Sequence, residues 1–403
     1  MSPAPDRPAP REALGVRASG LSGPFLRPRG GGPRGTAGGP ARNGRATTTL
    51  AVAFDPRSNS LSVLRLLLAG TVAVAHTLDL GFGFQPQAGS SDFGSLAVDG
   101  FFVLSGFLVA RSYLRLDSLR RFAWHRALRI LPGFWACLLG TGLVVAPLLA
   151  VLVGRPWTSV FSGEDSAWSY VVSDAALVMR QFTVAGLPGT ATSTDQLDGS
   201  LWTLAFEASC YAALAVLGVL GVLRRRALVL GLVLVLWALT VAPVAGLDVL
   251  GHPLLQRLHG PDVLRFGLVF LLGAAGHLYA DRVPVRGVLA LAGTGLVVVG
   301  LALLPDHRAL AAPAFAYVVL YAVVRLPLRW TPPWDLSYGV YVWHWPVAQL
   351  LTAAGAAALT TAPFVLLGLA VTAVLAAASW TLVERPALGL KDAAWVTGGR
   401  ARP

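Results

Sequence analysis

Histidine, arginine and carboxylate side chains inside apolar runs are the residues here best suited to chemistry. Arg65 and His76 share the run 61–83. Eleven residues of α-helix turn through about 1100° and rise ~16 Å, so both side chains would face one direction at two depths. Glu207 and Tyr211 would share a face of another run. A histidine and a carboxylate at a similar depth could form an acid–base pair, although a lone membrane histidine is as often a helix contact.

A basic run offers a second kind of chemistry. Residues 120–129 read RRFAWHRALR. Arginine forks match phosphate oxygens in geometry and charge, so Arg126 and Arg129 could cradle the phosphates of a cytosolic cofactor. Arg111 and Arg115, just before the run, could contribute to the same site. A topology signal is the simpler interpretation of such a run.

Other polar and aromatic positions suit either substrate binding or helix packing. The small pair Ser105-Gly106 would let a ligand or a neighbouring helix approach closely. An aromatic belt at the membrane surface does not explain His344, which lies inside an apolar run one turn after Tyr341. The positions in this group are Asp99, Ser105, Trp202, Tyr211, Tyr341 and His344.

The apolar runs place these residues inside a membrane. Hydrophobic residues make up 55% of the chain and charged residues 13%, whereas soluble domains are about 25% charged. Runs near 20 residues recur, each long enough to cross a hydrocarbon core of ~30 Å. We therefore expect an all-α, polytopic integral membrane bundle of about ten transmembrane helices. The expected spans are 61–83, 97–113, 131–152, 200–222, 227–246, 263–280, 286–304, 310–325, 336–354 and 362–383.

The distribution of positive charge predicts the orientation. The net charge of +12 comes from arginines in the short gaps between apolar runs, which favours membrane topology over nucleic-acid binding. With the N-terminus cytoplasmic, four arginines fall on the outer side: Arg155, Arg180, Arg257 and Arg308. The inner side holds Arg111, Arg115, Arg120, Arg121, Arg126, Arg129, Arg224, Arg225, Arg226, Arg282, Arg286, Arg325, Arg329, Arg385, Lys391, Arg400 and Arg402. We expect a bacterial inner (plasma) membrane protein with both termini cytoplasmic.

The chain divides into three parts. Residues 1–57 are rich in Pro, Gly and Arg and predict a disordered cytoplasmic tail without a secretory signal. Residues 58–390 form the membrane domain, and 391–403 form a short cytoplasmic tail. Cys137 and Cys210 lack paired or metal-ligand spacing, so we interpret them as small buried hydrophobes and expect no metal.

Taken together, these stretches resemble the acyltransferase-3 family of integral membrane acyltransferases. The match begins with arginine, ten residues and histidine in the first span, and covers about residues 60–388. It continues in the family's order through VDGFFVLSGFLVARSY, RALRILPGFW, GSLWTLAFEASCYAAL, LSYGVYVWHWP and LVERP. Asp198 stands where many relatives with the GSLWTL motif carry asparagine, and the long N-terminal tail has no recognised counterpart.

The resemblance implies an O-acyltransferase that moves an acyl group, commonly acetyl from acetyl-CoA, to a hydroxyl of a carbohydrate or glycosylated small molecule. His76 matches the family's essential histidine, Arg65 its partner arginine and Glu207 the glutamate after SLWTL. Arg126 and Arg129 match its basic motif. We expect the donor to bind from the cytoplasm and His76 to act as the general base, with Glu207 orienting the ring.

A secondary transporter is the alternative from another class, because transporters also place His, Glu and Arg within spans. Transporters usually show internal repeats with broken helices near the bilayer midplane. The 61–83 and 200–222 patterns have no repeat in the second half of this chain. The expected partners are therefore the lipid bilayer, an acyl-CoA and a carbohydrate-containing acceptor, and the sequence does not indicate an oligomeric state.

Overall fold

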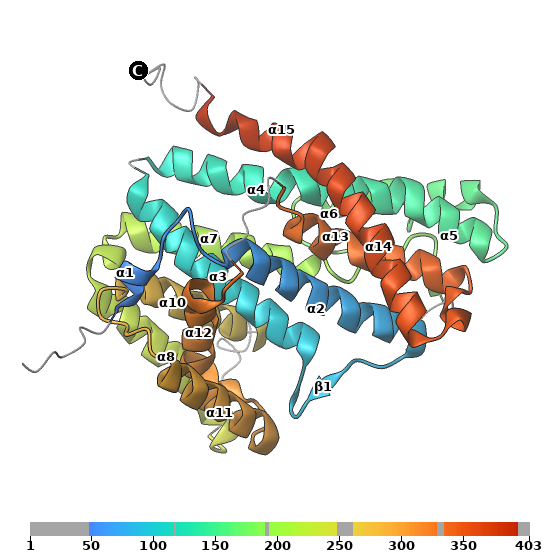
Figure 1. Cartoon of the computed structure of the whole chain (residues 1–403). Helices are drawn as coiled ribbons and strands as arrows, with labels where there is room; N and C mark the ends of the chain where they lie inside the picture. The colour runs from blue at the N-terminus through green and yellow to red at the C-terminus, as the bar shows by residue number, and fades with distance from the viewer. Residues whose placement is uncertain (1–47, 117, 190–192, 248–260, 329–333, 394–403) are drawn as a thin grey trace, which may run out of the picture. The chain divides into compact units, whose positions relative to one another are not determined.

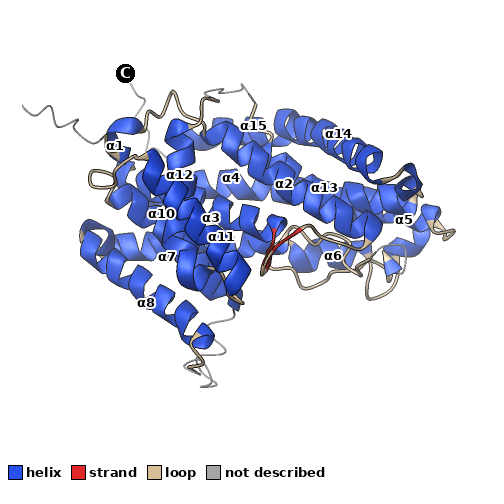
Figure 2. Cartoon of the chain, turned by 60° about the horizontal axis from the view of Figure 1, so that its bottom comes forward, coloured by secondary structure: helices blue, strands red, loops and turns tan. Residues whose placement is uncertain are grey.

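The structure is a computed structural model that describes residues 48–116, 118–189, 193–247, 261–328 and 334–393. The described chain is mainly helical (Figure 1). Its strands β1 (Gln87–Ala88) and β2 (Ser91–Asp92) form a small antiparallel hairpin (Figure 2). The helices are α1 (Leu50–Ala53), α2 (Leu61–Phe82), α3 (Phe93–Arg115), α4 (Leu119–Gly140), α5 (Ala146–Leu152), α6 (Ala167–Asp174), α7 (Trp202–Val219), α8 (Arg226–Val244), α10 (Pro261–Leu278), α11 (Gly287–Leu303), α12 (Arg308–Arg325), α13 (Ser337–Ala353), α14 (Thr361–Ser379) and α15 (Arg385–Leu388).

A helix covers most of each apolar run that the sequence predicts as a span. Seven helical segments are long and apolar enough to cross a membrane. They are Leu61–Phe82, Phe93–Arg115, Leu119–Leu152, Trp202–Val219, Arg226–Val244, Arg308–Arg325 and Thr361–Asp392. The helix α11 is apolar but has only 17 residues, and α10 and α13 are not among the seven. The all-α membrane fold is confirmed, whereas the number of ten spans stays a prediction.

The basic run 120–129 lies inside a helix rather than in a loop between spans. The helix α4 begins after Ser118, whose hydroxyl accepts the Arg121 amide, and continues past Pro132. A wider π-type turn over Thr141–Val145 links it to α5. A proline such as Pro132 is tolerated inside a membrane helix because neighbouring groups adjust to the loss of its amide hydrogen bond. Beside this proline the Tyr338 hydroxyl donates to the Ile130 carbonyl over 2.7 Å, which ties α4 to α13.

The beginning of the described chain also differs from the prediction. Residues 48–57, which we assigned to the disordered tail, are folded. They include α1, in which Leu50 is buried and its amide donates to the Val283 carbonyl. The Val285 amide donates to the Thr48 carbonyl. Apolar burial and backbone pairing with a distant loop, neither visible in the local composition, hold this segment. Residues 1–47 lie outside the described residues.

The helix α3 is the centre of the bundle and packs against α2, α7, α10 and α12. Its contact with α10 is unusually close because two glycines meet there. A β-carbon on Gly106 would lie 1.9 Å from the Phe270 carbonyl oxygen, and one on Gly273 would lie 2.0 Å from that of Val103. Small residues let membrane helices approach backbone to backbone. The Ser105-Gly106 pair thus serves helix packing through its glycine.

The connection from α2 to α3 brings the end of one helix beside the start of the next. Gly83 ends α2 in the left-handed region, with φ of 72°, which suits glycine. The chain then runs through the β1–β2 hairpin, and Asp92 caps α3 by accepting the Ser95 amide over 2.6 Å. This turn places His76, in the last two turns of α2, close to Gly94.

Candidate active site

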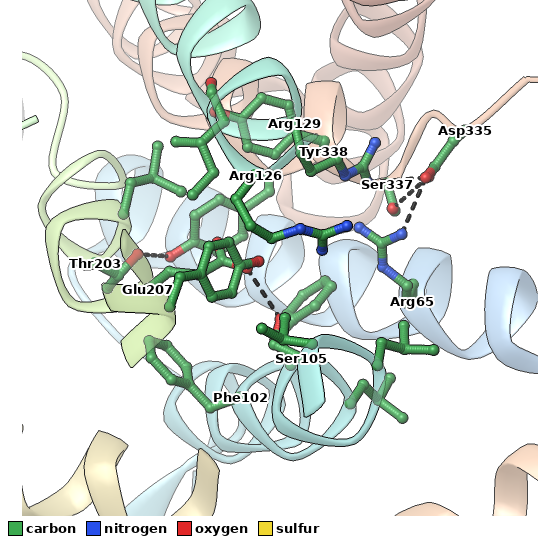
Figure 3. Close-up of a pocket in the computed structure, with 18 of the residues that line it drawn as sticks. Arg65, Phe102, Ser105, Arg126, Arg129, Thr203, Glu207, Asp335, Ser337 and Tyr338 are labelled. Carbon is green, nitrogen blue, oxygen red and sulfur yellow. Dashed lines mark hydrogen bonds and ion pairs between the residues drawn. The ribbon is translucent and has the colours of Figure 1, made fainter. Parts of the chain in front are cut away.

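A cavity of about 480 Å³ opens between α2, α3, α4, α7 and α13. Its volume lies in the range of ~300–1,000 Å³ typical of small-molecule sites. Figure 3 shows side chains from these helices converging on it. The polar and charged residues that line it are Arg65, Ser105, His125, Arg126, Arg129, Thr203, Glu207, Tyr211, Asp335, Ser337, Tyr338, Tyr341 and Lys391.

Asp335 joins two of the predicted arginines at one side of the cavity. Its Oδ2 atom accepts from Arg65 over 3.0 Å and from Arg129 over 2.8 Å, and its Oδ1 accepts from the Ser337 hydroxyl. Burial alone would raise the pKa of Asp335, but the two guanidinium groups outweigh it and hold that pKa well below its usual range. The carboxylate is therefore charged at neutral pH and fixes both arginines in place.

Arg126 lies between Asp335 on one side of the cavity and Glu207 on the other (Figure 3). Its guanidinium forms no ion pair with a carboxylate that the structure describes. Its carbon Cζ stands 5.7 Å from the centre of the Tyr211 ring, which favours a cation–π contact. Its Nε atom is buried and has no hydrogen-bond partner in the described chain. A partly buried guanidinium that makes no described hydrogen bond is suited to bind an anion that enters the cavity.

Glu207 lies on the opposite side of the cavity from Asp335. Its Oε1 atom accepts from the Ser105 hydroxyl over 2.9 Å and from the Tyr211 hydroxyl. Nearby, the Thr203 and Tyr341 hydroxyls share a hydrogen bond. These contacts join α3, α7 and α13 and line the cavity with hydroxyl groups (Figure 3).

His76 and His344 form a pair just beyond the cavity. The distance between His76 Nδ1 and His344 Nε2 is 2.8 Å, and the Trp345 ring packs edge-on against His76. The ring of Tyr341, which lines the cavity, lies 6.1 Å from that of His344. The expected pairing of His76 with Glu207 is not seen, since no hydrogen bond among the described residues joins them.

Two of the four arginines predicted to bind the donor do not line the cavity. Arg111 stacks over the Phe54 ring at 4.9 Å, and Arg115 is exposed at the end of α3. Ser105 and Val109 occupy the cavity face of the same helix. The sequence places all four arginines near one membrane surface, but helical rotation turns Arg111 and Arg115 away. Arg111 and Arg115 therefore lie outside this cavity, and their role in donor binding stays a prediction.

Asp99 is held in a buried ion cluster. Its carboxylate, 1% exposed, accepts from Arg265 Nε over 2.8 Å and from Arg308 Nε over 2.7 Å. Arg308 also bonds Asp306 over 3.1 Å. The cluster ties α3 to α10 and α12. Of the two roles considered for Asp99, substrate binding and helix packing, these contacts support helix packing. Trp202 likewise packs against aromatic rings, including Phe266, and is not part of the cavity lining.

Several site residues escaped sequence reasoning. Asp335 follows two prolines in a connection, where a carboxylate reads as an ordinary surface residue, and only its partners reveal its role. Arg265 is a charge inside the apolar run 263–280, and this signal could have singled it out from the sequence. Glu384, the carboxylate of the LVERP motif, is buried and accepts from the Ser379 hydroxyl over 2.9 Å.

The fold and the cavity define a membrane-embedded helical protein with an interior polar site, and comparison with known proteins identifies its kind. Residues 58–382 match the acyltransferase-3 family model, described as an acyltransferase domain, so the chain belongs to that family. It is 29% identical over 367 residues to nodulation protein 10 of Rhizobium leguminosarum bv. viciae. The aligned region covers 83% of this chain and 94% of that protein.

A second relative carries an activity in its name. The chain is 28% identical over 338 residues to an O-acetyl transferase of Shigella phage Sf6, covering 82% of this chain and 96% of the relative. No solved structure matches the chain. The chain is therefore an O-acyltransferase, and neither comparison favours the transporter alternative.

Proposed function

We propose that the protein transfers an acyl group, with acetyl as the expected one, from acyl-CoA to a hydroxyl of a carbohydrate or glycosylated acceptor. The observation that carries this proposal is the cavity itself, in which the Arg126 guanidinium, whose buried Nε atom has no hydrogen-bond partner in the described chain, lies among further cations. In the orientation given by the positive-inside rule, its basic side faces the cytoplasm, where CoA is available. The termini would then be cytoplasmic and the membrane the plasma membrane.

Arg126 is the residue best placed to hold a phosphate group of the donor. Arg65 and Arg129 already share the Asp335 carboxylate, whereas Arg126 pairs with no carboxylate in the described chain. Lys391, which also lines the cavity, adds a second cation. Charge-assisted hydrogen bonds of this kind contribute about 1.5–3 kcal/mol each.

His76 would act as the general base at the far end of the donor arm. Arg65 and His76 lie ~16 Å apart along α2, a span that a long flexible thioester arm can cover. The proposal places the thioester between Tyr341 and His76. As the acceptor oxygen attacks the thioester carbonyl, its proton passes to His76. The carbon–sulfur bond then breaks, and the proton moves to the departing thiolate to give free thiol and ester.

Donor binding can be tested by comparing two donors in the Arg126→Gln variant. If Arg126 contacts phosphate, the KM for acetyl-CoA should rise about 10- to 100-fold, as a loss of 1.5–3 kcal/mol requires. The KM for S-acetyl-pantetheine, which lacks phosphate, should change less than threefold, and Arg111→Gln should change neither. An equal rise for both donors, or none, would contradict the phosphate role of Arg126.

A further inference from the structure

The hydrogen bonds of His344 determine which of its ring nitrogens carries a proton. Its Nδ1 atom lies 2.7 Å from the Tyr341 carbonyl oxygen and 3.2 Å from that of Val340. Carbonyl oxygens only accept, so Nδ1 must carry a hydrogen and donate it. The side chain is 1% exposed, and no described ion pair or hydrogen bond joins it to a carboxylate. Burial without a counter-charge disfavours imidazolium, so His344 is neutral.

A neutral His344 protonated on Nδ1 has a lone pair on Nε2. The His76 Nδ1 atom stands 2.8 Å from that lone pair and must therefore be the donor. Neutral His76 then holds its hydrogen on Nδ1, and its own Nε2 has a free lone pair.

We propose that His344 is a positioning residue that holds His76 in the tautomer whose Nε2 atom can accept a proton. This role rests on the proposed function, in which His76 is the base. In many acyl-transfer sites a carboxylate orients the histidine in this way. Here the acceptor is a neutral imidazole, which suits a buried site because it needs no second buried charge.

The other polar groups near His76 are engaged elsewhere. Asp79 accepts from the Gln85 amide over 3.0 Å, and Asp92 caps α3. Neither carboxylate has a described hydrogen bond to His76. The free Nε2 atom faces the start of α3, where a β-carbon on Gly94 would lie only 3.9 Å away. Because residue 94 is a glycine, no β-carbon contacts Nε2 from this side.

The proposal fixes the direction of each proton step. The acceptor O–H bond breaks as its oxygen bonds to the acyl carbon, and the proton moves to His76 Nε2. The imidazolium keeps its Nδ1–H hydrogen bond to His344, which stabilises the positive charge. The Nε2 proton then passes to the thiolate released from the acyl carbon, which returns His76 to its starting tautomer.

Two substitutions of His344 separate positioning from packing. His344→Gln can place an amide oxygen near the former Nε2 position and keep an acceptor for the His76 Nδ1–H group. His344→Leu has comparable bulk but no acceptor. The measurements are kcat and KM for acetyl-CoA, together with ¹⁵N NMR of imidazole-labelled protein, which reports the His76 tautomer without turnover. His76→Gln identifies the His76 resonance by its loss.

We expect wild type and His344→Gln to show His76 protonated on Nδ1, and His344→Leu to show it protonated on Nε2. The kcat of His344→Leu should fall at least 100-fold with the KM unchanged within threefold, whereas His344→Gln should retain at least a tenth of wild-type kcat. His76 protonated on Nε2 in wild type, or an unchanged tautomer in His344→Leu, would overturn the proposal. The expected tautomers with full activity in His76→Gln would instead refute the role of His76 as the base.

Discussion

Replacing Asp198 by asparagine should make the protein less sensitive to alkaline pH. Asp198 lies just before α7 and is 1% exposed. Its Oδ1 atom accepts from the Ser200 amide and hydroxyl, and its Oδ2 lies 3.4 Å from the Cys137 sulfur. No cation is paired with it among the described residues. Burial raises the pKa of Asp198 to about 7, although these hydrogen bonds oppose the rise.

The sign and size of the effect follow from this shift. An unfolded aspartate ionises near pH 3.9, so between pH 4 and 7 the folded state binds more protons than the unfolded state, and stability falls as the pH rises. A shift of about three pKa units corresponds to ~4 kcal/mol lost by pH 8, of which ~1.5 kcal/mol is already lost at pH 5. Wild type should therefore lose ~2.5 kcal/mol through Asp198 between pH 5 and 8.

Asp198→Asn keeps the shape of the side chain but removes the ionisation. The assay is reversible unfolding in mixed micelles at pH 5 and pH 8, followed by tryptophan fluorescence. The variant should gain ~2.5 kcal/mol on wild type as the pH rises across this range. Asp195→Asn, at an exposed position in the same connection, should follow wild type. Parallel pH dependence of wild type and Asp198→Asn would refute the argument that Asp198 is buried without a paired cation.

Two further substitutions test how the helices are held together. Asp99→Asn leaves the Arg265 guanidinium buried without a carboxylate, so we expect a loss of about 3–5 kcal/mol in the same unfolding assay. Adding Arg265→Gln should restore part of it, and a loss below 0.5 kcal/mol in the single variant would refute the ion cluster. Gly106→Ala places a β-carbon against the α10 backbone and should lower the melting temperature by several degrees. Gly70→Ala meets no atom within 4 Å and should not lower it, so equal behaviour of the two variants would contradict the close packing.

The sequence predicted the helices well because apolar length is a local property. The apolar run that contains Arg65 and His76 forms α2, and the run that contains His344 forms α13. Sequence also selected these residues, because an ionisable group within an apolar run stands out. Their partners are a different matter. His76 and His344 are 268 residues apart, and only the packing of α2 on α13 brings them together.

Where the structure places side chains differently from the sequence prediction, the physical causes are of the same kind. Arg111 and Arg115 were grouped with Arg126 by depth in the membrane, but rotation about the α3 axis decides which side chain reaches the cavity. Glu207 was placed near His76 by counting depth, yet it bonds Ser105 on α3. Depth along one axis can be estimated from a sequence, whereas the direction in which a side chain points depends on the neighbouring helices.

Acyl transfer from radiolabelled acetyl-CoA by the purified protein in detergent, with wild type beside His76→Ala, tests the central claim most directly. Removing a general base typically costs ~10²–10⁴-fold in rate. We expect wild type to move label from the thioester to an acceptor hydroxyl, and a folded His76→Ala protein with unchanged acetyl-CoA binding to show at least 100-fold slower transfer. Undiminished transfer by a His76→Ala protein with the melting temperature of wild type would contradict the account.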